Sequence, residues 1–358
     1  MKYLTEYRDR HATERLAEKI RTVVTQPWVL MEVCGGQTHS IVKNALEQLL
    51  PASVQLVHGP GCPVCVTAAE ILDQAIALAQ RPDVILCSFG DMLRVPGSQQ
   101  SLQAVKATGA DVRMLYSPMD ALAIARANPQ RKVVFLAVGF ETTGPATALA
   151  LAQARQWRLN NFFVLLSHFL VPPAISTIVE GLNNRVQGFL APGHVCAVTG
   201  IEPYQQLVAR YRVPMVITGF EPVDILQGIL CCVAQLERGE ARVENPYRRV
   251  ANDQGNARAQ SLVNDVFEVS DQHWRGIGSI ANSGLRLSPS YQMFNAVALL
   301  DTALPAASPS ECISGDILQG IKKPKQCPHF GHRCRPEHPL GAPMVSSEGA
   351  CAAYFNYQ

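Results

Sequence analysis

Residues 133–158 read VVFLAVGFETTGPATALALAQARQWR and contain one complete strand–helix unit. The run 133–138 is continuously apolar and rich in β-branched residues, as a buried strand is. It breaks at Gly139, and residues 146–158 then have the spacing and the good helix formers of a helix. A strand that ends in glycine and leads into a helix is the repeating unit of a parallel α/β sheet.

The same unit recurs along the first 220 residues. Most gaps between the apolar runs hold ten or more residues with helical spacing, for instance 68–80. The eight expected strands are 29–33, 54–58, 84–88, 112–116, 133–138, 162–167, 186–190 and 215–218. We therefore predict an α/β fold with two similar parallel-sheet domains, built of βα repeats and facing a cleft.

The expected domain boundaries follow from a polar, proline-containing linker and from the point where the strand–helix pattern ends. Residues 128–132 are polar and contain a proline, with four expected strands on each side. Beyond residue 219, helices are expected at 224–236 and 256–266, then glycine- and serine-rich sequence and a connector at 302–310. The predicted organisation is an N-terminal helical segment, 1–27, packed on the third domain, then α/β domains 28–129 and 130–222, and an irregular C-terminal domain, 223–358.

Composition excludes several classes of protein. The 358 residues include 31 basic and 29 acidic side chains, so the net charge of +2 indicates no nucleic-acid surface. The first ten residues are too polar for a secretory signal, and the longest apolar runs are shorter than the ~20 residues of a membrane span. We expect a cytosolic protein without a membrane anchor, and in that compartment 11 cysteines indicate metal binding or redox chemistry rather than disulfide staples.

Four cysteines stand in the proline-rich C-terminal tail. They are Cys312, Cys327, Cys334 and Cys351. Four thiolates suit an iron–sulfur cluster or a structural zinc, and ligation would give this tail the constraint that its sequence otherwise lacks. Their wide spacing and the Cys327-Pro328 step favour the cluster, zinc being the alternative; four unrelated free thiols are the remaining reading.

A second thiol centre is expected near the N-terminus. Cys34 follows an expected strand and precedes two glycines, so its sulfur should emerge at the carboxyl end of that strand, where open α/β sheets bind ligands. Cys62-Pro63-Val64-Cys65 stands between a strand and a helix. The pattern permits a redox couple, a metal site or inert thiols.

Other polar side chains follow the expected strands. His39, His58, Asp91, Glu141, His168 and His194 all do so. If the sheets face one another, these residues line a cleft shared with Cys34. Taken singly, each histidine is more often a core or capping residue than a ligand; proline–glycine before His194 and glycine before His39 distinguish these two.

Several motifs together resemble the HypD family of nickel–iron hydrogenase maturation proteins over essentially the whole chain. They are MEVCGG at 31–36, GPGCPVC at 59–65, FGD at 89–91 with RVPG at 94–97, GFETT at 139–143, APGHV at 191–195 and VSSEGAC at 345–351.

This resemblance implies a scaffold that, with a small partner of the HypC family, holds one iron while it acquires two cyanides and one carbonyl. The Fe(CN)2CO unit then passes to the hydrogenase large subunit. Cys34 would be the iron-binding thiolate, Cys62 and Cys65 would pass electrons, and the four tail cysteines would hold a 4Fe-4S cluster. HypE-family and HypF-family proteins would supply the cyanide.

One position departs from the family pattern, which commonly has histidine where this chain has Gln37. Glutamine donates a hydrogen bond but is no cationic acid, which leaves His39 as the donor candidate, with Glu141 or Asp91 orienting such donors. Two other functions stay open: a self-contained iron–sulfur thiol/disulfide oxidoreductase, and a two-lobed binding module. No dinucleotide fingerprint or P-loop is present in the sequence.

Overall fold

A computed structural model describes residues 5–300 and 310–357. All eight expected strands are present, with small shifts at their ends, which confirms the α/β prediction. Their bounds are β1 Trp28–Glu32, β2 Val54–His58, β3 Val84–Ser88, β4 Val112–Met114, β5 Lys132–Gly139, β6 Phe162–Phe169, β7 Gly188–Pro192 and β8 Met215–Thr218. The connector expected at 302–310 lies, apart from Ser310, outside the described residues.

Helices fill the gaps between the strands. They are α1 Arg10–Val23, α2 Gly35–Lys43, α3 Pro63–Val66, α4 Ala69–Ala79, α5 Leu102–Ala107, α6 Pro118–Ala127, α7 Gly144–Gln156, α8 Val171–Val179, α9 Gly193–Thr199, α10 Glu202–Tyr211, α11 Pro222–Glu237, α12 Ala257–Val266, α13 Ser314–Leu318 and α14 Ala350–Tyr357. Several begin with a proline, whose missing N–H costs nothing in the first turn. Among the described residues, no helix is long and apolar enough to cross a membrane.

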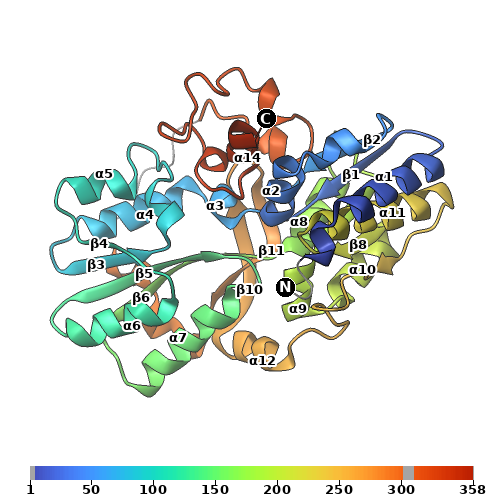
Figure 1. Ribbon diagram of the computed structural model, residues 1–358. Helices are drawn as coiled ribbons and strands as arrows, with labels where there is room; N and C mark the ends of the chain where they lie inside the picture. The colour runs from blue at the N-terminus through green and yellow to red at the C-terminus, as the bar shows by residue number, and fades with distance from the viewer. Residues whose placement is uncertain (1–4, 301–309, 358) are drawn as a thin grey trace.

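The strands form two sheets in two lobes (Figure 1). The first sheet has the order β2-β1-β7-β8-β9, all parallel, with β9 at Val243–Glu244. The second has the order β10-β11-β6-β5-β3-β4. Its strands β3 to β6 are parallel, and an antiparallel hairpin of β10, Phe267–Trp274, and β11, Gly278–Leu287, completes it.

The lobes are not the consecutive segments 28–129 and 130–222 that the sequence suggested. Strands β1 and β2 pair with β7 and β8, whereas β3 and β4 pair with β5 and β6. The chain therefore crosses to the second lobe after β2 and returns after β6. Parallel strands need a crossover connection in any case, and the segments after β2 and after β6 lead to the other sheet instead of back to the same one.

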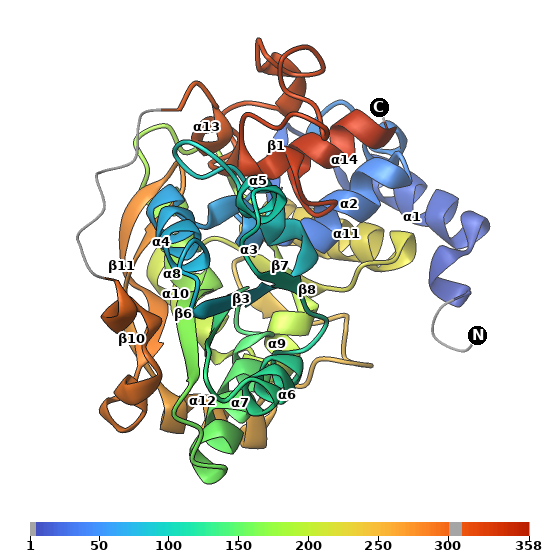
Figure 2. The same cartoon turned by 90° about the vertical axis from the view of Figure 1, so that its left-hand side faces the viewer.

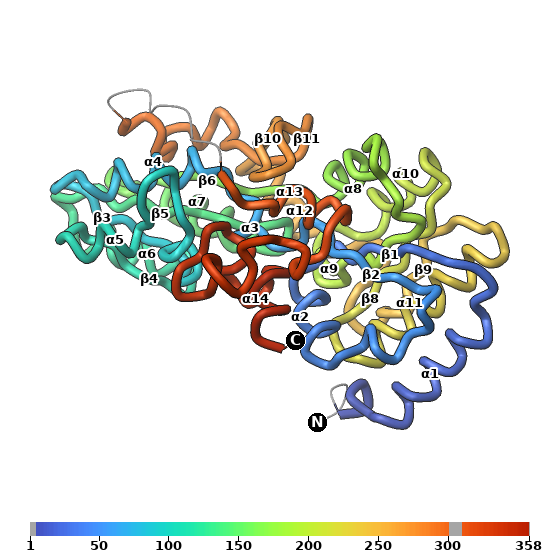
Figure 3. Tube along the Cα trace, turned by 90° about the horizontal axis from the view of Figure 1, so that it is seen from above, coloured from blue at the N-terminus to red at the C-terminus, as the bar shows by residue number. Residues whose placement is uncertain are grey.

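The predicted third domain, 223–358, is likewise distributed over the molecule. Helix α11 packs on the first sheet and against α1, where Leu16 and Ile20 meet Ile225 and Ile229. The hairpin β10–β11 belongs to the second sheet, and only residues 310–357 form a separate irregular layer. Figures 1 and 3 show this layer, in red, above and between the two lobes. The same layer covers α2 and α3 in the side view of Figure 2.

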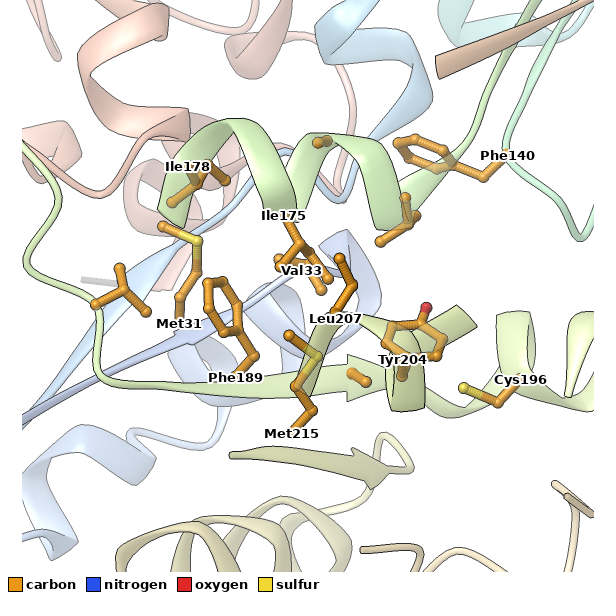
Figure 4. Packing of buried hydrophobic residues seen from close by; sticks show 14 of the residues in the cluster. Met31, Val33, Phe140, Ile175, Ile178, Phe189, Cys196, Tyr204, Leu207 and Met215 are labelled. Atoms are coloured by element: carbon orange, nitrogen blue, oxygen red, sulfur yellow. The ribbon is translucent and has the colours of Figure 1, made fainter. Parts of the chain in front are cut away.

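One hydrophobic cluster joins the lobes. Figure 4 shows Met31, Phe189 and Met215 of the first sheet packed under Ile175 of α8, with Phe140 of the same cluster near the other end of that helix. The cluster continues to Trp274 at the tip of the hairpin, whose side chain is fully buried. This shared core fixes the two lobes relative to each other.

Candidate functional site

Cys34 stands where β1 gives way to α2, as predicted. It is the residue before the first turn of α2 and is 4% exposed, and its backbone N–H donates to Glu32 Oε2 at 3.0 Å. Burial raises the pKa of the Cys34 thiol, and the nearby charges of Glu348 and Glu32 raise it further. The unliganded side chain is therefore a neutral thiol at pH 7.

Close backbone approaches leave room only for glycine at two positions around Cys34, Gly61 and Gly35, and the space at Gly36 is tight. A Cβ on Gly61 would overlap the Cys34 backbone, and one on Gly35 would lie 2.5 Å from the Glu348 carbonyl oxygen. A Cβ on Gly36 would lie 3.1 Å from the Phe220 ring and 3.7 Å from Cys34 Sγ. Segments from the first lobe, the loop before Cys62 and the tail thus meet at this thiol.

His194 faces Cys34 from the neighbouring strand. It follows β7 at the start of α9, and its Nδ1 lies 4.0 Å from Cys34 Sγ. Its ring packs edge-on against Phe220 at 5.0 Å between centroids. Burial lowers the pKa of His194 to about 4, so the imidazole is neutral at pH 7 and offers one N–H donor and one acceptor.

Below the thiol lies a buried polar network that the sequence reasoning missed. His58 Nδ1 lies 2.7 Å from Glu32 Oε1, and His58 Nε2 lies 2.9 Å from the hydroxyl of Tyr354 in α14. Thr38 also donates to Glu32, whose pKa is raised by burial. The available signal was an acidic residue inside the apolar run 29–33. The network connects the floor of the site to the C-terminal helix.

His39 and Gln37, on the same helix, have different surroundings. His39 Nδ1 lies 3.0 Å from the Ser347 carbonyl oxygen, and its ring packs edge-on against Tyr357 at 5.3 Å. Gln37 is fully buried, and its amide N–H groups donate to Ala191 and Thr218 carbonyl oxygens, both at 3.3 Å. Gln37 therefore joins the carboxyl ends of β7 and β8.

Asp91 acts on the site through the tail. It forms an ion pair with Arg94 at 3.0 Å, and Arg94 also donates to the Val345 carbonyl oxygen at 3.0 Å. Burial and then the charge of Asp91 raise the pKa of Glu348. Glu348, for which the sequence motif predicted no separate role, lies against Gly35, the residue after Cys34.

Two other predicted cleft residues have their contacts elsewhere. Glu141 Oε1 accepts a hydrogen bond from the Val171 N–H at 2.8 Å, and burial raises the pKa of this carboxyl group to about 7. His168 lies 3.4 Å from the Thr147 hydroxyl, its ring stacks on Phe267, and burial lowers its pKa to about 4. Glu141 thus contacts the core between the lobes and His168 packs inside the second lobe, and neither has a contact with Cys34 among those of the described residues.

Cys62 and Cys65 form a disulfide bond. Cys62 is the residue before α3, and both side chains are buried. Gly61, which touches the Cys34 backbone, immediately precedes Cys62. The disulfide therefore begins one residue away from the wall of the Cys34 site.

The four tail cysteines gather within the irregular layer. Cys334 and Cys351 are buried beside Ile317 and Met344, and the Leu340 N–H donates to Cys334 Sγ at 3.4 Å. Burial raises the pKa of Cys351, and the charges of the other three tail thiols raise it further. Within the described residues, no three His, Cys, Asp or Glu side chains form a group that could hold a metal ion as they stand.

Comparisons with known proteins cover the whole chain. The family model "HypD: Hydrogenase formation hypA family" matches residues 11–358. The hydrogenase maturation factor HypD of Escherichia coli (strain K12) is 46% identical over 367 residues, which span 100% of this chain and 98% of the relative. HypD2 of Bradyrhizobium diazoefficiens is 46% identical over 368 residues, spanning 100% and 97%, and HypD of Rhodobacter capsulatus is 44% identical over 370 residues, spanning 100% and 98%.

Proposed function

The chain belongs to the HypD family of hydrogenase maturation factors, and from this premise we propose that it holds one ferrous iron on Cys34 while the iron acquires two cyanides and one carbonyl. A hydrogenase maturation factor works with other maturation proteins. We propose a small HypC-family protein as the direct partner, a HypE-family protein as the cyanide donor and a HypF-family protein upstream of it. The finished Fe(CN)2CO unit goes to the hydrogenase large subunit.

The observation that carries the proposal is the position of the Cys34 sulfur. The thiol is buried where the first lobe, the loop before Cys62 and the tail meet, with the His194 ring at 4.0 Å. A soft thiolate in a site shielded from water suits low-spin ferrous iron with strong-field diatomic ligands. Because burial raises the thiol pKa, iron binding must displace a proton from Cys34.

A neutral donor beside the thiol, His194, supports cyanide binding. A cyanide nitrogen bound to iron is a hydrogen-bond acceptor. His194 is neutral at pH 7 and can turn its N–H toward such a ligand. His39, whose Nδ1 donates to the Ser347 carbonyl oxygen in this structure, is the second donor candidate. Glu141, whose carboxyl group binds the Val171 N–H, is assigned to the core instead.

The tail donors fit a 4Fe-4S cluster in number and chemistry. We propose that Cys312, Cys327, Cys334 and Cys351 hold it, since the four cysteines stand in one layer with little apolar core of its own. When bound, such a cluster supplies one-electron transfer. The Cys62–Cys65 disulfide takes up two electrons and two protons to give two thiols, and we propose that this couple serves the reduction required during assembly.

Infrared spectroscopy of the anaerobically purified complex with the small partner tests the iron site. Cyanide and carbonyl stretching bands are expected in the wild type and in Cys231→Ser, a thiol in α11 away from the site. They should be absent from Cys34→Ala. Bands that persist in Cys34→Ala would place the iron elsewhere. A Cys62→Ser/Cys65→Ser double variant that still carries the complete group would exclude the electron role of the pair.

A second function has one observation in its favour. The buried Cys62–Cys65 disulfide would also suit a self-contained iron–sulfur thiol/disulfide oxidoreductase. Such an enzyme would turn over a small disulfide without a protein partner and without Cys34. Purified Cys34→Ala protein that, with an added chemical reductant as the electron source, catalyses the reduction of such substrates would favour it.

A further inference from the structure

The turn between β10 and β11 lies against the helix that carries the disulfide. The Arg275 N–H donates to the Val66 carbonyl oxygen at 2.8 Å, and Trp274 forms a bridge with Thr67. Val66 ends α3 and directly follows Cys65. The turn is thereby fixed to the disulfide segment by backbone contacts.

The same turn touches the tail on its other side. A Cβ on Gly315 in α13 would overlap the Gly276 carbonyl oxygen, so the two backbones are in direct contact. Gly276 has φ of +79°, which favours glycine. Helix α13 begins two residues after Cys312. Residues 274–276, the end of β10 and the start of the turn, thus connect the disulfide helix with the segment that holds the first of the tail cysteines.

The Arg275 side chain occupies the space between these elements. Its Nη2 donates to the Pro96 carbonyl oxygen at 2.6 Å, and it shares the lining of a cavity of about 410 Å³ with Cys312, Gly341 and Glu70. Burial lowers the pKa of Arg275, and the group that most favours its positive charge is Cys312, ahead of Glu70 and Asp73. In the described part of the chain, no carboxylate forms an ion pair with it.

We propose that Arg275 is a positioning residue for the tail centre: its guanidinium stabilises negative charge at the Cys312 corner and raises the reduction potential of a cluster bound there. The inference rests on the proposed cluster at the four cysteines. Reduction adds one negative charge, and a fixed cation that lines the same partly buried cavity as Cys312 favours the reduced form. Through Val66, the same residue keeps that corner next to the disulfide helix.

The test is a reduction-potential titration of the anaerobically reconstituted full-length protein, followed by electron paramagnetic resonance. For Arg275→Gln we expect the reduced-to-oxidised ratio at a fixed potential to fall about tenfold, which is about 59 mV for a one-electron couple. Arg275→Lys, which keeps the charge, should change the ratio by less than about threefold. The control is Arg286→Gln on the same hairpin, whose guanidinium is exposed and paired with Glu268; it should leave the ratio unchanged.

The outcomes separate this inference from the proposed function. Iron and acid-labile sulfide are measured first, and a wild-type chain that takes up neither overturns both proposals. An Arg275→Gln protein with a full cluster and the wild-type potential overturns the role of Arg275 alone. If Arg275→Gln takes up no cluster, the Arg275→Lys variant provides the test. A full cluster in Arg275→Lys whose reduced-to-oxidised ratio nevertheless falls tenfold would contradict a role for the positive charge.

Discussion

At the scale of single residues, the Cys34 site depends on backbone packing. Gly61 lies against the Cα and N atoms of Cys34. The Cys34 backbone cannot move away from Gly61 without displacing the end of β1. We expect Gly61→Ala to lower the free energy of unfolding by about 2 kcal/mol or more, because the overlap is with backbone rather than with a flexible side chain. Chemical denaturation measures this. Gly144→Ala, whose nearest neighbour would be at 3.6 Å, should cost little, and an equal loss in both variants would contradict the argument.

Glu141 makes stability depend on pH in a predictable direction. Its pKa is 4.5 in the unfolded reference and about 7 in the folded chain, so between these values only the folded chain holds the proton. Stability therefore falls as pH rises through this window. His168 and His194, with pKa values lowered to about 4, have the opposite effect between pH 4 and 6.5. The contribution of Glu141 to this pH dependence is therefore obtained from the difference in unfolding free energy between the wild type and a variant at position 141.

Glu141→Gln keeps an oxygen for the Val171 N–H and removes the ionisation. We expect the variant to gain about 3 kcal/mol relative to the wild type between pH 4 and pH 8, an order-of-magnitude figure from the shift. Urea denaturation at both pH values measures the gain. Glu268→Gln, on the exposed side of the hairpin, should show no such difference. A Glu141→Gln protein with the same relative stability at both pH values would argue against a buried carboxylic acid.

Sequence predicted part of the residue-level picture for a clear reason. Carboxyl ends of parallel strands meet at one edge, so Cys34 after β1 and His194 after β7 were expected to face the same space, and their atoms lie 4.0 Å apart. The rule predicts at which edge of the sheet a residue lies, but not which way its side chain points. It placed Glu141 in the cleft, whereas its carboxyl group turns to α8. It also passed over Glu348, because the tail has no regular pattern that would bring it to Cys34.

At the scale of elements, the strands were predictable and their partners were not. Both sheets contain strands that are apolar on both faces, so composition gives no sign of which sheet a strand joins. The hairpin β10–β11 was missed altogether. Strand β10 buries large side chains only at its ends, Phe267 and Trp274, and reads as polar between them. A half-exposed edge hairpin lacks the apolar run that identifies a buried strand.

Trp274 is the residue that fixes this hairpin to the rest of the core. Its fully buried ring lies 4.8 Å from Phe169 and 5.9 Å from Phe140, and its Nε1 donates to Ser283 at 2.8 Å. We expect Trp274→Ala to lower the free energy of unfolding by about 3–5 kcal/mol through the cavity and the lost burial. Hydrogen exchange should also quicken across 267–287.

The matched comparison for that variant is Trp157→Ala. The Trp157 ring is 42% exposed and contacts the Arg126 guanidinium at 4.9 Å, so its loss should cost less than about 1 kcal/mol. If Trp274→Ala destabilised the protein no more than Trp157→Ala, the hairpin would not be a structural connection between the lobes.

At the scale of the whole molecule, the chain order makes the two lobes interdependent. Each sheet takes strands from two separate stretches, and the tail lies across both lobes (Figure 3). Helix α14 contributes Tyr354 to the network under Cys34, and Ser347 contacts His39. The tail layer is thus one wall of the Cys34 site, and whatever orders the tail also closes that wall.

This arrangement predicts the effect of removing the metal centre that we propose for the tail. If ligation supplies the constraint that residues 310–357 lack, anaerobic chelation should quicken hydrogen exchange in α14 first. The amides of α2 should follow, since α14 packs on α2 through Tyr354 and Val42. Helix α7, in the second lobe and away from the tail, is the internal control and should keep its protection. Faster exchange in α14 with α2 unchanged would show that the tail closes no wall of the Cys34 site, and equal loosening of α7 would indicate general unfolding instead.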